Sequence, residues 1–124
     1  MRRASAGLGE QAALLERVAA APRRSVLFTG MGASYAACYA PVTVLAGLGV
    51  RASMVDTAEL LHFRRRQLGP DDLLVVVSQS GRSAEAVRLV DSPAPGGRPV
   101  VVAVTNGDDN PLASSADVSM DTSA

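Results

Sequence analysis

The sequence predicts an α/β domain, a three-layer αβα sandwich built on a five-stranded parallel sheet of flavodoxin-like order. Short apolar runs alternate with helical segments along the chain, which is the pattern of right-handed βαβ units. The runs are continuously apolar, as expected for strands that are covered on both faces. With 124 residues, the chain has room for one such domain. We therefore expect residues 1–124 to form a single domain, with a lead-in at 1–24 and the sheet core at 25–124.

The first third of the chain predicts two helices and one strand. Apolar side chains recur at helical spacing over residues 8–21, and Pro22 ends the pattern. A short buried strand is expected at 25–29. Residues 33–48 are rich in small and apolar side chains and predict a second helix. Because the ring of Pro41 removes one backbone hydrogen bond inside this helix, we expect it to kink or to split there.

The middle of the chain predicts two more strands with a short helix between them. The first strand is expected at residues 50–55, and the helix follows with Thr57 as its N-cap. Residues 69–72, with the sequence Gly-Pro-Asp-Asp, predict a turn. The next strand, at 73–77, is the most hydrophobic of the chain.

The last third predicts a helix at residues 83–90, a loop at 92–97 and a strand at 99–104. Asn110, followed by a proline, predicts the N-cap and the first position of another short helix. A fifth strand is expected at 117–121. The chain stops soon after it with no helix behind it, so we expect the domain to be truncated at its C-terminus.

The composition argues against several classes of function. The 12 basic and 12 acidic residues cancel, which argues against nucleic-acid and anionic-membrane partners. All the basic residues are arginines, so the chain offers no lysine as a Schiff base or general base. Cys38 is the single cysteine, so we expect no intrachain disulfide, no metal and no cofactor. Without a long apolar run or a signal peptide, the sequence predicts a cytoplasmic protein.

Two stretches rich in glycine and hydroxyl groups follow predicted strands. Residues 30–34, with the sequence Gly-Met-Gly-Ala-Ser, follow the first strand, and residues 78–83, Ser-Gln-Ser-Gly-Arg-Ser, follow the third. Such loops leave backbone N–H groups and serine hydroxyls free at the positive end of a helix, which suits a phosphate group. Two of them in one small domain predict a site for a phosphorylated small molecule.

The order of these motifs resembles the sugar isomerase (SIS) family of phosphosugar-binding domains. The resemblance is carried by the glycine-rich loop at 30–34, by Ser-Gln-Ser-Gly at 78–81 and by Thr-Asn at 105–106. A stretch at 58–61 is similar to the family's Ala-Ser-Glu-Phe segment. The likeness covers nearly the whole chain and is greatest to the first SIS domain in the isomerase half of glucosamine-6-phosphate synthase, a glutamine–fructose-6-phosphate aminotransferase.

The resemblance implies a ligand and a set of residues that hold it. The ligand would be a phosphorylated sugar such as fructose 6-phosphate or glucosamine 6-phosphate. The residues that match the family's binding positions are Gly32, Ser34, Ser78, Gln79, Ser80 and Ser83. Ala33 stands where the family often has threonine, so one hydroxyl is missing. Because SIS domains pair to form their sites, the resemblance also implies a homodimer or a second SIS domain as partner.

The resemblance implies no catalytic residue in this chain. In the synthase, the carboxylate that moves the proton, a ring-opening histidine and a lysine lie in the second SIS domain or the tail. This chain would supply the phosphate cradle of an aldose–ketose isomerase or aminotransferase without being active alone. A regulatory SIS domain that senses a phosphosugar and a non-functional fragment remain as alternatives.

Other interpretations of single motifs are weaker. The glycines at 30–32 imitate a dinucleotide fingerprint, but Tyr35 occupies the third glycine position. Ser80 does not lie in the Gly-x-Ser-x-Gly pattern of a nucleophile elbow. His62 and Glu59 are expected to be surface, capping or interface residues, and the arginines at 64–66 a solvated or interface charge run, with sugar-phosphate binding from a neighbouring subunit as the alternative.

Overall fold

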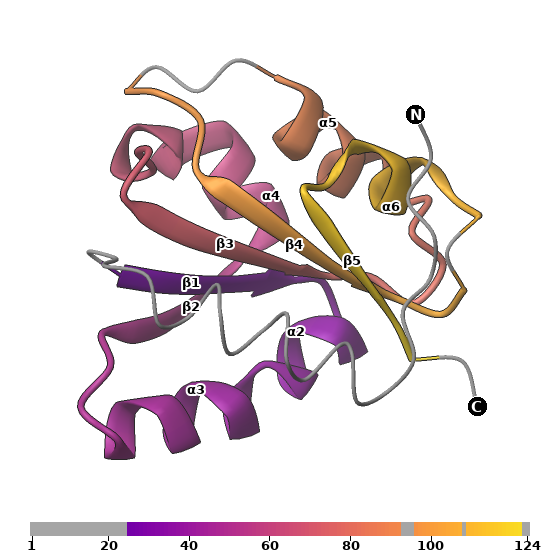
Figure 1. Ribbon diagram of the computed structural model, residues 1–124. Helices are drawn as coiled ribbons and strands as arrows, with labels where there is room; N and C mark the ends of the chain where they lie inside the picture. Colours follow the sequence, from indigo (N-terminus) through magenta and orange to yellow (C-terminus); the bar gives the residue numbers. More distant parts are fainter. Residues whose placement is uncertain (1–24, 93–95, 108, 123–124) are drawn as a thin grey trace.

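A computed structural model describes residues 25–92, 96–107 and 109–122 of the chain. Figure 1 shows the elements along the described part. The helix expected at 8–21 and part of the loop expected at 92–97 lie outside these residues.

Five parallel strands form one sheet in the order β2-β1-β3-β4-β5, so the predicted fold class and flavodoxin-like order are confirmed. The strands are β1 (Ser25–Gly30), β2 (Ala52–Asp56), β3 (Asp72–Val77), β4 (Val100–Thr105) and β5 (Val118–Asp121). The three central strands carry nothing but buried or half-buried residues. Their continuous apolar runs are therefore explained by cover on both faces.

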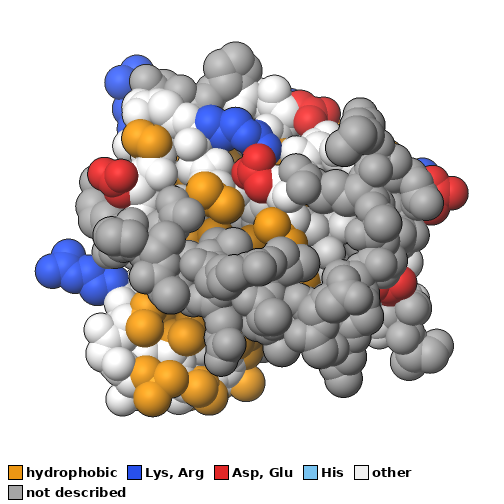
Figure 2. All heavy atoms as spheres, viewed as in Figure 1, with side chains coloured by type: hydrophobic (Ala, Val, Ile, Leu, Met, Phe, Trp, Pro, Cys, Tyr) orange, Lys and Arg blue, Asp and Glu red, His pale blue; other side chains and the backbone are white. Residues whose placement is uncertain are grey.

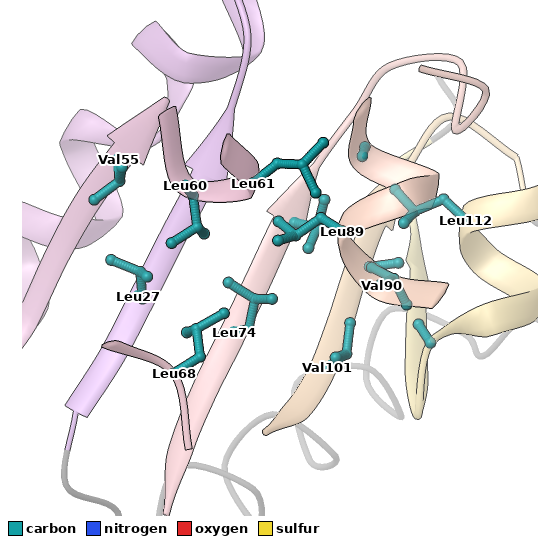
Figure 3. Close-up of a cluster of buried hydrophobic side chains, with 14 residues drawn as sticks. Leu27, Val55, Leu60, Leu61, Leu68, Leu74, Leu89, Val90, Val101 and Leu112 are labelled. Atoms are coloured by element: carbon teal, nitrogen blue, oxygen red, sulfur yellow. The ribbon is translucent and has the colours of Figure 1, made fainter. Parts of the chain in front are cut away.

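The helices cover the two faces of the sheet unequally. On one face lie α4 (Thr57–Glu59), the π-helical turn η1 (Leu60–Arg64), α5 (Ala84–Asp91) and α6 (Pro111–Ser115). A short 3-10 turn, η2 (Arg65–Gln67), continues from η1. Figure 3 shows leucine and valine side chains of these helices meeting those of the strands in one large cluster. This face is sealed by aliphatic packing.

The opposite face carries α2 (Ala33–Ala37) and α3 (Tyr39–Gly47) (Figure 1). Its buried cluster is smaller and includes Phe28, Val75 and Cys38. Burial raises the pKa of the Cys38 thiol, so the sulfur stays protonated at neutral pH. Its Sγ–H donates to the Ser34 carbonyl at 3.3 Å, which fixes it inside the helix junction.

The helix expected at 33–48 is split into α2 and α3, as the position of Pro41 predicts. The break falls at Cys38, three residues before the proline. Without an N–H, Pro41 gives no hydrogen bond to the carbonyl of Ala37, and its ring crowds that group. The strand that follows begins at Ala52, later than predicted, because the N–H of Val50 still donates to the Leu45 carbonyl at 3.0 Å.

The N-cap of α4 is Asp56, so the prediction of Thr57 in that role is wrong. Asp56 Oδ1 accepts from the N–H groups of Ala58 at 2.9 Å and Glu59 at 3.3 Å. The hydroxyl of Thr57 is instead buried against Thr29, with 3.0 Å between the two Oγ1 atoms. A strand that ends in a carboxylate therefore provides the cap, and the threonine ties the helix to the sheet.

The change Asp56→Ala is expected to lower the free energy of unfolding by about 1 kcal/mol, because two N–H groups at the start of α4 lose their acceptor. Chemical denaturation monitored by circular dichroism measures this. The control is Asp71→Ala at an exposed aspartate, which should change stability by less than about 0.5 kcal/mol. Equal effects of the two changes would contradict the capping role.

Candidate functional site

The two glycine- and serine-rich loops lie side by side at one edge of the sheet. One follows β1 and the other follows β3, and these strands are neighbours in parallel register. The chain passes from β1 to β2 on one side and then crosses to β3 on the other side. The β1–β3 edge is therefore the topological switch point, where open α/β sheets bind their ligands. The hydroxyl of Ser83 lies 3.8 Å from the sulfur of Met31, so the loops are in contact.

The glycines of the first loop allow β1 to turn sharply into α2. A Cβ at Gly30 would lie 2.7 Å from the carbonyl carbon of Ser34, so only glycine fits this close approach. Gly32 has a positive φ of 57°, and nothing lies within 4 Å of the place where its Cβ would be. The loop therefore presents an open backbone beside the half-buried Ser34.

The serines of the second loop fold that loop on itself. Ser78 Oγ accepts from Gly81 N at 3.2 Å, and Ser80 Oγ accepts from Arg82 N at 3.1 Å. Ser83 is the N-cap of α5, because its Oγ accepts from Ala86 N at 3.5 Å. Each oxygen thus accepts a backbone N–H, while a hydroxyl also carries a hydrogen that it can donate.

The predicted site residues differ in exposure and surroundings. Ser78 is buried at 7% exposure, whereas Gln79 and Ser80 are exposed at the tip of the loop. Ser34 and Gln79 line part of a groove that we call the sheet groove, of about 740 Å³. Most of its lining is apolar and comes from α2, α3 and the β1, β3, β4 and β5 strands, including Phe28 and Val75.

The described residues bring few charges near the loops. Arg82 is a cation within the second loop, and its guanidinium donates to the Asp109 carbonyl at 3.1 Å. Glu59 forms an ion pair with Arg64 at 3.0 Å, which keeps both charges at the two ends of the η1 turn. Among the described residues, no three histidine, cysteine or carboxylate side chains are grouped closely enough to hold a metal ion. In the same part of the chain, every helix is too short or too polar to cross a membrane.

One contribution to the site was missed in the sequence. The segment between β4 and α6 supports the second loop: Asn106 N donates to the Gln79 carbonyl at 2.9 Å, and Leu112 N donates to the Gly81 carbonyl at 3.1 Å. Asn110 was predicted only as an N-cap, and that role is confirmed by its 2.9 Å bond from Ala113 N. The signal for the further contact is weak, because only the fold brings these segments together.

Known proteins resemble this chain at several levels. A family model described as SIS domain matches residues 21–124. The arabinose 5-phosphate isomerase KpsF of Escherichia coli is 33% identical over 92 residues, which are 74% of this chain and 29% of that protein. The chain therefore spans less than a third of the curated relatives that it matches.

Solved structures share the fold. The c3406 protein of Escherichia coli CFT073, in complex with arabinose 5-phosphate, has a TM-score of 0.83 at 24% identity, covering 96% of this chain and 62% of that one. The NanR protein of Vibrio vulnificus complexed with ManNAc-6P has a TM-score of 0.74 at 23% identity, covering 95% and 44%. The sugar isomerase domain of the RpiR transcription factor from Sphaerobacter thermophilus has a TM-score of 0.77 at 24% identity, covering 94% and 64%.

A pair of glycine substitutions separates backbone strain from contact in the two loops. Gly32 and Gly81 both have a positive φ, 57° and 67°, but a Cβ at Gly81 would lie 2.0 Å from Asn110 Oδ1. Gly32→Ala is expected to cost about 1 kcal/mol of stability through strain alone. Gly81→Ala should cost about 2 kcal/mol more, because Asn110 must move. Denaturant unfolding of both variants measures the difference, and equal losses would contradict this account of Gly81.

Proposed function

The chain belongs to the SIS family, and from this premise we propose that it binds a phosphorylated sugar between the loops that follow β1 and β3. The proposed ligand-binding residues are Gly32, Ser34, Ser78, Gln79, Ser80 and Ser83. The single observation that carries the proposal is the contact between the two loops at the switch point of the sheet. Residues 1–124 would form one binding domain.

The chemistry of the loops suits a phosphate with a sugar attached. Exposed Ser80 offers a hydroxyl hydrogen, and the start of α5 offers backbone N–H groups and a positive dipole end. Arg82, in the same loop, adds a cation that attracts a dianion. The amide of Gln79 both donates and accepts, which fits a sugar hydroxyl at the mouth of the sheet groove.

The names of the relatives guide the choice of sugar. The curated relatives are arabinose 5-phosphate isomerases, so the narrower likeness to glucosamine-6-phosphate synthase is not what they support. We therefore place arabinose 5-phosphate first among the candidate ligands and keep fructose 6-phosphate and glucosamine 6-phosphate beside it. The N-acetylmannosamine-type ligand named for NanR extends the panel.

We propose that this chain binds without completing a reaction on its own. Aldose–ketose isomerisation moves a proton between neighbouring carbons through an enediol, and this step needs a general base. Asp56, level with Gly30 across the β1–β2 pair, is engaged as the cap of α4. Glu59 is paired with Arg64. A second SIS domain, in another copy or another chain, would supply the base.

A regulatory role is the second candidate, and it uses the same binding without any reaction. The folds of NanR and of the RpiR sugar isomerase domain favour it, since both proteins carry this domain. The two candidates differ in one observable. A sugar-sensing domain leaves the bound sugar unchanged when every partner domain is present, whereas an isomerase half does not.

The first test is isothermal titration with arabinose 5-phosphate, fructose 6-phosphate, glucosamine 6-phosphate and unphosphorylated glucosamine. We expect saturable binding that requires the phosphate. The change Ser80→Ala should weaken it at least about tenfold, because a hydrogen bond to a charged group is lost. Ser114→Ala, at an exposed serine of α6, is the matched control and should bind like the wild type.

Two outcomes of the titration would contradict the proposal. Binding of glucosamine as tight as that of glucosamine 6-phosphate would exclude a phosphate-directed site. Folded protein that binds none of the phosphosugars would mean that the loops serve only the architecture. Proton NMR of the bound sugar then shows whether any isomer forms.

We also propose that the chain forms a homodimer through α3, whose surface remains apolar. In α3 no residue is buried, and Val44 is 62% exposed. Leu48, directly after the helix, is 75% exposed. Figure 2 shows hydrophobic side chains gathered over α3, at the lower left. Exposed apolar surface of this kind marks an interface in soluble proteins.

Leu48→Glu is expected to convert the dimer to monomer, because burying an unpaired carboxylate in an apolar interface costs several kcal/mol. Size-exclusion chromatography with light scattering at micromolar concentration measures this. Phe63→Glu is the control, since Phe63 is 84% exposed on η1 over the opposite face of the sheet. A wild type that is monomeric at every concentration would refute the dimer.

A further inference from the structure

The second loop is held from one side by the segment between β4 and α6, which we call the clasp (residues 105–107 and 109–112). Three backbone bonds join the loop to the end of β4 and to the clasp. Ser78 N donates to the Val104 carbonyl at 3.0 Å, and the bonds from Asn106 and Leu112 reach the carbonyls of Gln79 and Gly81. The loop therefore keeps its shape only while the clasp keeps its own.

Asn110 is the side chain at the centre of the clasp. It is buried at 6% exposure, and its Nδ2 donates to Thr105 Oγ1 at 3.2 Å and to the Gly107 carbonyl at 3.1 Å. Its Oδ1 accepts from Ala113 N as the cap of α6. Both ends of the amide are thus satisfied, which fixes the plane of the group.

The fixed amide lies directly against the second loop. A Cβ on Gly81 would come within 2.0 Å of Asn110 Oδ1 and 2.7 Å of its Nδ2, so the amide fills the space where any other residue would carry a side chain. Gly81 is also the residue whose N–H bonds to Ser78 Oγ. The amide plane therefore sets where Gly81 sits and, through it, where the Ser78 hydroxyl points.

We propose that Asn110 is a positioning residue that holds the Ser78–Gly81 loop in its binding shape, beyond its role as a helix cap. The inference rests on the proposed function, because it assigns a part in the same site. A cap needs only an oxygen acceptor, which Ser and Asp also provide. Holding the loop needs the two N–H donors of the amide, which neither Ser nor Asp has.

The test compares Asn110→Ser and Asn110→Asp with Ser114→Ala, an exposed position on the same helix. Amide hydrogen exchange of the ligand-free protein is measured at Asn106, Leu112 and Gly81, whose N–H groups make the bonds of the loop and clasp. Both variants should exchange about tenfold faster there, the effect of losing about one net hydrogen bond. Exchange in β1 and β3 should stay unchanged.

Affinity for the phosphosugar that the wild type binds best is the second readout. We expect it to fall about tenfold in Asn110→Ser, with Ser114→Ala unchanged. Unchanged exchange at the three amides in a folded variant would overturn the proposal, as would faster exchange spread equally over the sheet. Since exchange is measured without ligand, it decides the role of Asn110 even if the wild type binds no sugar.

A third variant protects the test if Asn110→Ser does not fold. Thr105→Val removes the oxygen that accepts from Asn110 Nδ2 and leaves the cap of α6 intact. Local loosening at Gly81 and Leu112 in this variant supports the positioning role. Wild-type exchange at these amides would contradict it.

Discussion

The parallel pairing of β1 with β3 is the constraint on which the rest of this molecule depends. It sets Leu27 beside Leu74 in register and brings the carboxyl ends of both strands to the same edge. Each strand end must then turn back over the sheet, and glycines make these turns possible at Gly30 and Gly81. Because neighbouring parallel strands cannot be joined by a short hairpin, the helices between them are forced onto the two faces. The candidate site is a result of this pairing.

The second loop uses the same serine oxygens for its own shape that we propose for ligand binding. Hydroxyls of Ser78, Ser80 and Ser83 accept backbone N–H groups within the loop or at the start of α5. A loop built in this way is ordered before any ligand arrives, so little conformational entropy is lost on binding. Its support comes from three regions that are distant in sequence, namely β3, the clasp and the end of β4.

Much of the fold could be predicted because it follows from local patterns. Apolar runs located the strands, and Asn110 before a proline located the cap of α6. The cap of α4 was misassigned because Asp56 and Thr57 are both good N-caps, and only the burial of Thr57 against Thr29 decides between them. The contact of Asn110 with Gly81 could not be predicted, since it joins residues that the sheet alone brings together. The ligand-binding residues remain predictions.

The unequal cover of the sheet has a consequence for how this sequence can vary. Along β3, Leu74 and Val76 face the sealed cluster, whereas Leu73, Val75 and Val77 face the sheet groove. A larger side chain has no free space on the first face but finds about 740 Å³ on the second. Tolerance to enlargement should therefore alternate residue by residue within one strand. Homologous chains, or a library of variants, would carry bulkier residues at every second position, and the groove could change its shape while the opposite half of the core stays the same.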